Sequence, residues 1–103
     1  IAFIETQNID FIQELVEYVG PSYEFLTRVK AAEACKELNF CNPELAKNLM
    51  DAVNNANRRL KNPCGKVLKY FYAQIHYQDL LVREYFLNDW TDEQKSTIEK
   101  YLR

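Results

Sequence analysis

The chain has 103 residues, a net charge of −2 and an apolar fraction of 48%. This length fits one domain, the apolar fraction is enough for a core, and so small a charge gives no general attraction to nucleic acid or membranes. The only two glycines, Gly20 and Gly65, exclude a glycine-rich phosphate loop or dinucleotide fingerprint. We expect residues 1–103 to form a single domain. Because it begins with Ile1 and not Met, we interpret it as a piece of a longer or processed chain.

The three cysteines are an odd number and cannot all pair within the chain. They form no CxxC motif and no zinc-binding spacing with the single histidine, so no metal site and no cofactor are predicted. Free thiols are typical of the reducing interior of a cell, which indicates a cytoplasmic or nuclear protein. No apolar run approaches the roughly 20 residues of a spanning helix, so we expect no membrane insertion.

Apolar residues recur at helical spacing along nearly the whole chain. Residues 1–7 fit either a short strand or the first turn of a helix. A first helix is expected from Asn8 or Asp10 to Val19, and the Gly-Pro pair that follows ends it. The serine after that pair is expected to cap a second helix over residues 23–38.

The third expected helix has the clearest start signal. In Asn42-Pro43-Glu44, Asn can cap the helix, Pro fits its first position, and Glu faces the positive end of the dipole. The spacing predicts a helix from there to about Leu60, which the Asn-Pro pair at 62–63 ends.

A long fourth helix over residues 64–87 is predicted at the centre of the bundle. Between Val67 and Leu87, fourteen of 21 residues are apolar or aromatic, which is more than one buried face needs. At 100° per residue these side chains divide into two roughly opposite faces. One face carries Leu68, Phe71, Ile75, Val82 and Phe86, and the other carries Tyr70, Ala73, Tyr77, Leu80 and Leu81.

The second face of this helix has two interpretations. Either the other helices surround the fourth helix and bury both faces, or the side with Tyr70 and Tyr77 is free to meet another chain. We adopt the second interpretation, which exposure of these two tyrosines would support and full burial would contradict. The predicted docking residues on this helix are Tyr70, Tyr77, Leu80, Leu81 and Glu84.

The end of the chain completes the expected fold. Thr91 to Gln94 has the pattern of a capping box and predicts a last short helix. The sequence therefore predicts an all-α, compact bundle of about five helices. Capped helices joined by short loops also fit a fragment of an α-solenoid.

One basic cluster lies around the expected turn between the third and fourth helices. Residues 1–51 hold four basic and nine acidic side chains, whereas residues 52–103 hold nine basic and six acidic. The cluster can attract an acidic protein surface, although cations are also expected at helix ends. No aromatic residues interleave with it to stack on bases, which disfavours nucleic acid. It comprises Arg58, Arg59, Lys61, Lys66 and Lys69, of which the first four are predicted docking residues.

Two residue types could support chemistry. His76 has Asp79 three residues further on, but the nearest cysteine in sequence, Cys64, is about 18 Å away along a continuous helix. Cys64 stands at the expected start of that helix, where the dipole and nearby lysines stabilise a thiolate. We therefore predict that Cys64 reacts faster with an alkylating probe than Cys35 or Cys41.

These observations favour a non-catalytic protein–protein interaction module of a larger intracellular protein, such as an adaptor or scaffold, that docks a partner or forms a homodimer. No catalytic residue is assigned. One alternative is a carrier of a small hydrophobic ligand, which requires an apolar cavity of some hundreds of Å³, roughly the size of a ligand pocket, inside the bundle. The other is a redox-sensitive thiol protein or enzyme that uses Cys64.

Overall fold

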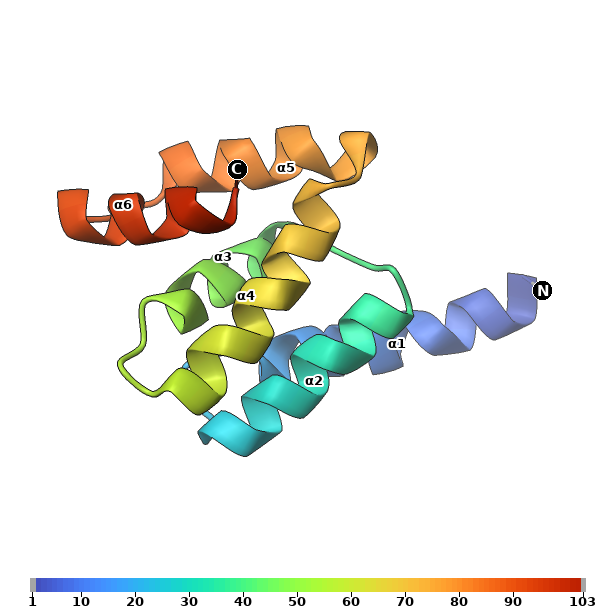
Figure 1. Ribbon diagram of the computed structural model, residues 1–103. Coiled ribbons are helices and arrows are strands. Elements are labelled where there is room, and N and C mark those ends of the chain that lie inside the picture. Colours follow the sequence, from blue (N-terminus) through green and yellow to red (C-terminus); the bar gives the residue numbers. More distant parts are fainter. Residues whose placement is uncertain (1, 103) are drawn as a thin grey trace.

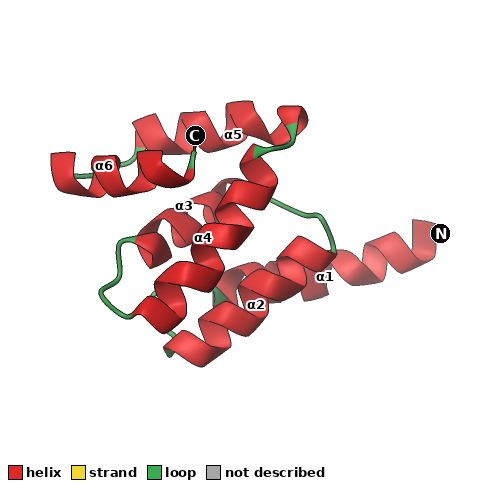
Figure 2. Cartoon of the chain, in the orientation of Figure 1, coloured by secondary structure: helices red, strands yellow, loops and turns green. Residues whose placement is uncertain are grey.

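The computed structural model describes the backbone of residues 2–102 and the side chains of residues 10–102, and all regular structure in this range is helical (Figure 2). This confirms the predicted all-α fold, with six helices in the described residues. The helix that was expected from Asn8 or Asp10 begins earlier, so the described part of residues 1–7 is helical. The helices are α1 (Ala2–Tyr18), α2 (Phe25–Glu37), α3 (Pro43–Val53), α4 (Arg58–Tyr72), α5 (Ile75–Leu87) and α6 (Asp92–Tyr101).

Helix α4 runs through the middle of the fold and contacts α2, α3, α5 and α6 (Figure 1). Helix α1 packs on α2 and α3, and its first turns extend past the rest of the bundle. Helices α5 and α6 both pack on α3 and α4, and Tyr85 of α5 donates a hydrogen bond to Glu99 of α6 (Figure 1). None of the helices in the described range is long and apolar enough to cross a bilayer.

The core is formed mainly by α3 and α4. Seven of the eleven residues of α3 are buried, and α4 contributes a buried stripe that ends at Phe71. The largest side chains with less than 2% of their surface exposed are Phe71, Leu45, Leu49, Met50, Leu60, Leu68, Leu81 and Ile98.

The boundary between the third and fourth helices was predicted wrongly. Helix α3 ends at Val53 and α4 begins at Arg58, so Pro63 lies inside a helix. The asparagines between them make the turn, because short polar side chains can bond to nearby backbone groups. Asn54 donates to the carbonyl of Met50, and the side chain of Asn57 accepts from the amide of Arg59 at the start of α4.

The single long helix over residues 64–87 was also wrong, because the chain bends at residues 73–74 and separates α4 from α5. Side-chain amides hold the bend in place. Gln78 donates to the carbonyl of Tyr72 at the end of α4, and Gln74 donates to the side chain of Asn39. Neither Gly nor Pro stands at the bend, so the sequence has none of the usual signals for a helix end there.

The last helix confirms its predicted cap. Thr91 accepts from the amide of Gln94, and the Gln94 side chain accepts from the amide of Thr91. Further along α6, the ring of Tyr101 lies directly over Gly65 of α4, where an added Cβ would come within 2.2 Å of the ring. The absence of a side chain at Gly65 therefore lets α6 approach α4 closely.

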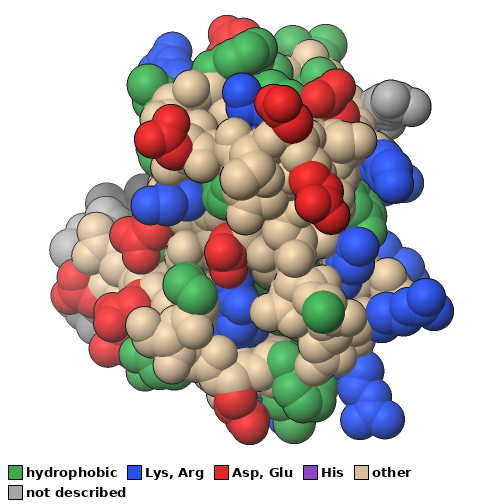
Figure 3. Space-filling model, turned by 90° about the vertical axis from the view of Figure 1, so that its left-hand side faces the viewer, with side chains coloured by type: hydrophobic (Ala, Val, Ile, Leu, Met, Phe, Trp, Pro, Cys, Tyr) green, Lys and Arg blue, Asp and Glu red, His purple; other side chains and the backbone are tan. Residues whose placement is uncertain are grey.

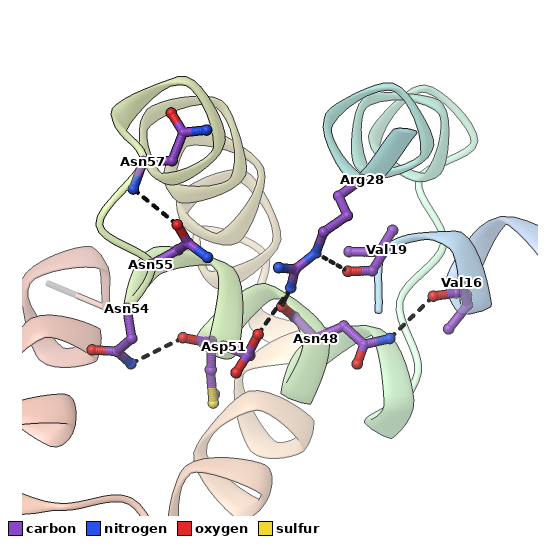
Figure 4. Close-up of polar contacts among 9 residues, drawn as sticks. Val16, Val19, Arg28, Asn48, Asp51, Asn54, Asn55 and Asn57 are labelled. Atoms are coloured by element: carbon purple, nitrogen blue, oxygen red, sulfur yellow. Dashed lines mark hydrogen bonds and ion pairs between the residues drawn. The ribbon is translucent and has the colours of Figure 1, made fainter. Parts of the chain in front are cut away.

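A buried arginine holds the end of α1 against α2 and α3 (Figure 4). Arg28 is 3% exposed, donates from Nε to the carbonyl of Val19 at 2.8 Å, and pairs through Nη2 with Asp51 at 3.0 Å. Asn48 donates to the carbonyl of Val16 at 3.1 Å. The last carbonyls of a helix lack partners within it and carry the negative end of its dipole. Arg28 supplies a donor to the Val19 carbonyl, and Asn48 adds a second donor to the Val16 carbonyl, which also accepts from the amide of Val19.

The second helix begins later than expected. It starts at Phe25 with Glu24 at its N-cap, so Ser22 does not cap it. No side chain accepts a hydrogen bond at this cap, and Arg28 donates its backbone amide to the carbonyl of Glu24.

Candidate functional site

One side of α4 carries cations without any carboxylate. The helix Arg58–Tyr72 contains five basic residues and no Asp or Glu. At 100° per residue, four of them lie within an arc of about 100°, and Lys61 lies about 60° outside that arc. The four are Arg58, Arg59, Lys66 and Lys69, and all of them are exposed.

These cations have no ionic partners within the described part of the chain. Among the side chains of residues 10–102, the one ion pair within 4.0 Å joins Arg28 to Asp51. Figure 3 shows several basic side chains gathered along the right-hand edge, whereas acidic side chains lie at the top, centre and left of the same view. The basic edge can attract an acidic molecule.

Helix α2 forms one border of this surface. A hollow of about 180 Å³ lies between α2 and α4, and Lys36 and Lys66 line it together with Glu33. The ammonium of Lys36 lies 5.3 Å from the centre of the Tyr70 ring, a cation–π contact. Tyr70 is 37% exposed. We define the cationic face as Arg58, Arg59, Lys66, Lys69, Lys36 and Tyr70.

Only part of the predicted docking surface lies on this face. Arg58, Arg59, Lys66 and Tyr70 come together, whereas Lys61 points elsewhere and is half-buried. Lys69 was noted in the basic cluster but left out of the predicted docking residues. Its ammonium lies 5.7 Å from the centre of the Tyr101 ring of α6, which positions it at the border of the face.

The docking residues predicted on α5 turn mostly toward α3 and α4. Leu81 has no exposed surface and belongs to the core, so its assignment to a docking surface was wrong. Tyr77 is half-buried, with its ring 5.3 Å from that of Phe71 and its hydroxyl donating to the carbonyl of Asn39. Leu80 is also half-buried, and Glu84 accepts a hydrogen bond from Asn88.

The opposite side of α5 is the exposed one. The helical wheel predicted one face that carries Leu68, Phe71, Ile75, Val82 and Phe86. In the structure Leu68 and Phe71 are buried, whereas the other three side chains are exposed. That grouping assumed one continuous helix. The bend at residues 73–74 interrupts the helical phase, so the face that is buried on α4 continues as the exposed face on α5.

The thiols do not have the setting that was predicted for Cys64. Cys64 is the seventh residue of α4 and is fully buried, so it does not stand at the helix start. Burial raises the pKa of the Cys64 thiol to about 11, with nearby Arg28 lowering it by a smaller amount. Burial likewise raises the pKa of Cys35 to about 11 and that of Cys41 to about 12. The setting therefore gives Cys64 no advantage as a nucleophile.

We expect all three thiols to resist iodoacetamide in the folded protein at pH 8, with Cys64 no faster than the others. The thiolate is the reactive form, and the raised pKa values keep the buried thiols protonated. The small rate in native buffer should rise about tenfold per pH unit up to about pH 11, as the thiolate fraction does. Unfolding in urea should expose all three cysteines. Mass spectrometry of the labelled peptides measures this. Rapid labelling of Cys64 alone in native buffer would contradict it.

Other candidate chemistry has little support in the geometry. His76 is exposed and its ring lies 4.2 Å from that of Tyr77. Within the described residues, no group of three or more His, Cys, Asp or Glu side chains is placed to hold a metal ion.

Two larger hollows are open grooves at the surface. The groove between α1 and α2 has a volume of about 430 Å³, and the groove beside α5 and α6 has about 370 Å³. Both open to solvent, unlike the internal cavity that a ligand carrier would require. The first is lined by Phe11, Leu15, Glu33, Ala34, Glu37 and Leu38, and the second by Tyr72, Val82, Tyr85, Phe86, Glu99 and Leu102.

No family model, no curated protein and no solved structure matches this chain. Any assignment of function therefore depends on the chemistry of the chain's own surface.

Proposed function

We propose that this domain is a non-catalytic protein–protein interaction module that binds an acidic segment of a partner protein along the cationic face of α4. The observation that supports this most directly is the row of four exposed cations without ionic partners in residues 10–102. Exposed like charges on one helix repel one another at some cost to stability. Such a cost is offset when a partner supplies the opposite charge.

The dimensions of the face suit a short extended peptide. Arg58 and Lys69 are eleven residues apart, which corresponds to about 16 Å along a helix. An extended strand covers that length with about five residues. Tyr70 lies beside Lys69 and offers part of an aromatic ring, so an apolar residue after the acidic ones can pack there.

One feature favours a protein partner over nucleic acid. The cations of α4 have no aromatic side chains between them on which bases could stack, because Tyr70 lies at one end. The three free, buried cysteines support the further proposal that the domain works in a reducing compartment, the cytoplasm or nucleus.

Fluorescence anisotropy with a labelled peptide tests the proposal. The probe has five Asp or Glu residues followed by Phe, and its control replaces each acid by the matching amide. We expect the acidic peptide to bind, the amide peptide not to bind, and binding to weaken as salt is added. Lys66→Glu should weaken binding by about fivefold to tenfold, since it replaces attraction by repulsion.

Lys47→Glu is the matched control, because Lys47 is exposed on α3 and its replacement changes the net charge equally. We expect this variant to bind the acidic peptide as the unmodified protein does. Equal weakening by both variants would show attraction to overall charge only and would contradict the proposal. Tighter binding of a single-stranded oligonucleotide than of the peptide would overturn it in favour of nucleic acid.

A further inference from the structure

The most exposed large apolar side chains of the described chain lie on α5. Ile75 is 84% exposed, Phe86 is 72% exposed and Leu87 is 70% exposed. At 100° per residue, Ile75, Val82 and Phe86 form a ridge within an arc of about 40°. Figure 3 shows hydrophobic side chains among charged ones at the top of the molecule, where α5 lies in Figure 1.

We infer that a second copy of this chain docks on this ridge, with the two α5 helices antiparallel across a twofold axis near the level of Leu81. In such a pair every contact occurs twice, because both chains present the same surface. The proposal concerns a surface separate from the cationic face of α4, so it does not rest on the proposed function.

The order of residues along α5 makes the face complementary to itself in that arrangement. Ile75 and Phe86 lie about equally far from Leu81 on opposite sides, so Ile75 of one chain meets Phe86 of the other. Asp79 and Arg83 also flank Leu81, each two residues away. Both are exposed on the same side of the ridge, so Asp79 of one chain meets Arg83 of the other. A parallel pair would instead place like charges together.

Both charged residues are available for these contacts. Asp79 and Arg83 are one helical turn apart, a spacing that permits an ion pair within the helix. Yet Arg28–Asp51 is the one ion pair among the side chains of residues 10–102. The groove of about 370 Å³ beside the ridge is lined by Val82 and Phe86, so it gives additional apolar surface to a second copy.

The size of the face indicates a weak dimer. Helix α5 has 13 residues and is about 20 Å long. One face of such a helix is smaller than the roughly 800 Å² per partner of a standard stable interface. We therefore expect reversible association with a dissociation constant of about 10–100 µM.

Charge reversal at the two ionic positions tests the geometry. A chain with Asp79→Arg presents two positive charges beside the ridge, and a chain with Arg83→Asp presents two negative charges. Each single variant should self-associate at least about tenfold more weakly than the unmodified protein, because both ionic contacts become repulsive. An equimolar mixture of the two variants should form heterodimers at least as tight as the original dimer, since every contact then joins opposite charges.

Sedimentation equilibrium from about 10 µM to about 1 mM measures all four samples, and circular dichroism confirms that each variant is folded. Both positions are exposed, so no loss of structure is expected. A monomeric unmodified protein over this range would overturn the inference. Single variants that dimerise as well as the original, or a mixture that does not recover association, would also overturn it.

Discussion

Replacing Phe71 by alanine is expected to lower the free energy of unfolding by about 3–5 kcal/mol. Phe71 has no exposed surface, and its ring packs edge-on against that of Tyr77, with 5.3 Å between the ring centres. The substitution removes most of a large side chain from the place where α4 meets α5. Urea denaturation followed by circular dichroism measures the change.

Phe86→Ala is the matched control for this prediction. It removes the same atoms from an exposed site, so we expect the free energy of unfolding of the monomer to change by less than about 0.5 kcal/mol. The urea denaturation must be done at low protein concentration, where self-association is negligible. Similar losses for the two variants would contradict the bend at residues 73–74, because one continuous apolar face would then be buried.

The second large effect is expected at Arg28. Arg28→Ala should lower the free energy of unfolding by about 2–4 kcal/mol, because it leaves a buried carbonyl without a donor and removes packing. The carbonyl of Val19 loses the donor 2.8 Å away. The ion pair itself contributes less than a buried pair would, because the side chain of Asp51 is 43% exposed.

Two further variants separate the packing of Arg28 from its hydrogen bonds. Arg28→Lys keeps the charge but lacks the planar donor fork that reaches α1 and α3 together, so most of the loss should remain. Asp51→Asn keeps an acceptor and should cost less than about 1 kcal/mol. Thermal and urea unfolding measure each variant. A loss for Arg28→Ala no larger than that for Asp51→Asn would contradict the role of Arg28 at the end of α1.

Capping residues in the sequence correctly predicted where α3 and α6 begin. The side chain of Asn42 accepts from the amide of Leu45, as its position before Pro43 indicated. Thr91 forms the expected capping box with Gln94. These signals succeed because the capping groups and the amides they bond lie within four residues of one another.

The errors arose where tertiary contacts decide the local structure. The Asn-Pro pair at 62–63 was expected to end a helix, but Pro63 lies in the second turn of α4 and the asparagines at 54–57 make the turn. The bend at residues 73–74 is held by Gln74 and Gln78, and Gln74 reaches Asn39 in a distant part of the sequence. A helical wheel uses only the spacing of residues within one helix, so it cannot predict a contact with a distant residue.

Only part of the candidate site was predictable. Composition located the basic cluster, but its residues were assigned to two different helices. The structure brings Arg58, Arg59 and Lys66 onto one unbroken helix, α4. The helical wheel failed on α5, where the predicted docking residue Leu81 is buried and Phe86 is exposed, because the phase of the helix is not carried across the bend.

The most direct measurement of the proposed function is a nitrogen-15 amide spectrum of the labelled domain, titrated with the unlabelled acidic peptide. We predict that saturable shift changes concentrate between Arg58 and Tyr70 and extend to Lys36, while the amides of α1 and α5 remain unchanged. Changes spread evenly over every lysine and arginine, or no change at all, would contradict the assignment of this face to an acidic partner.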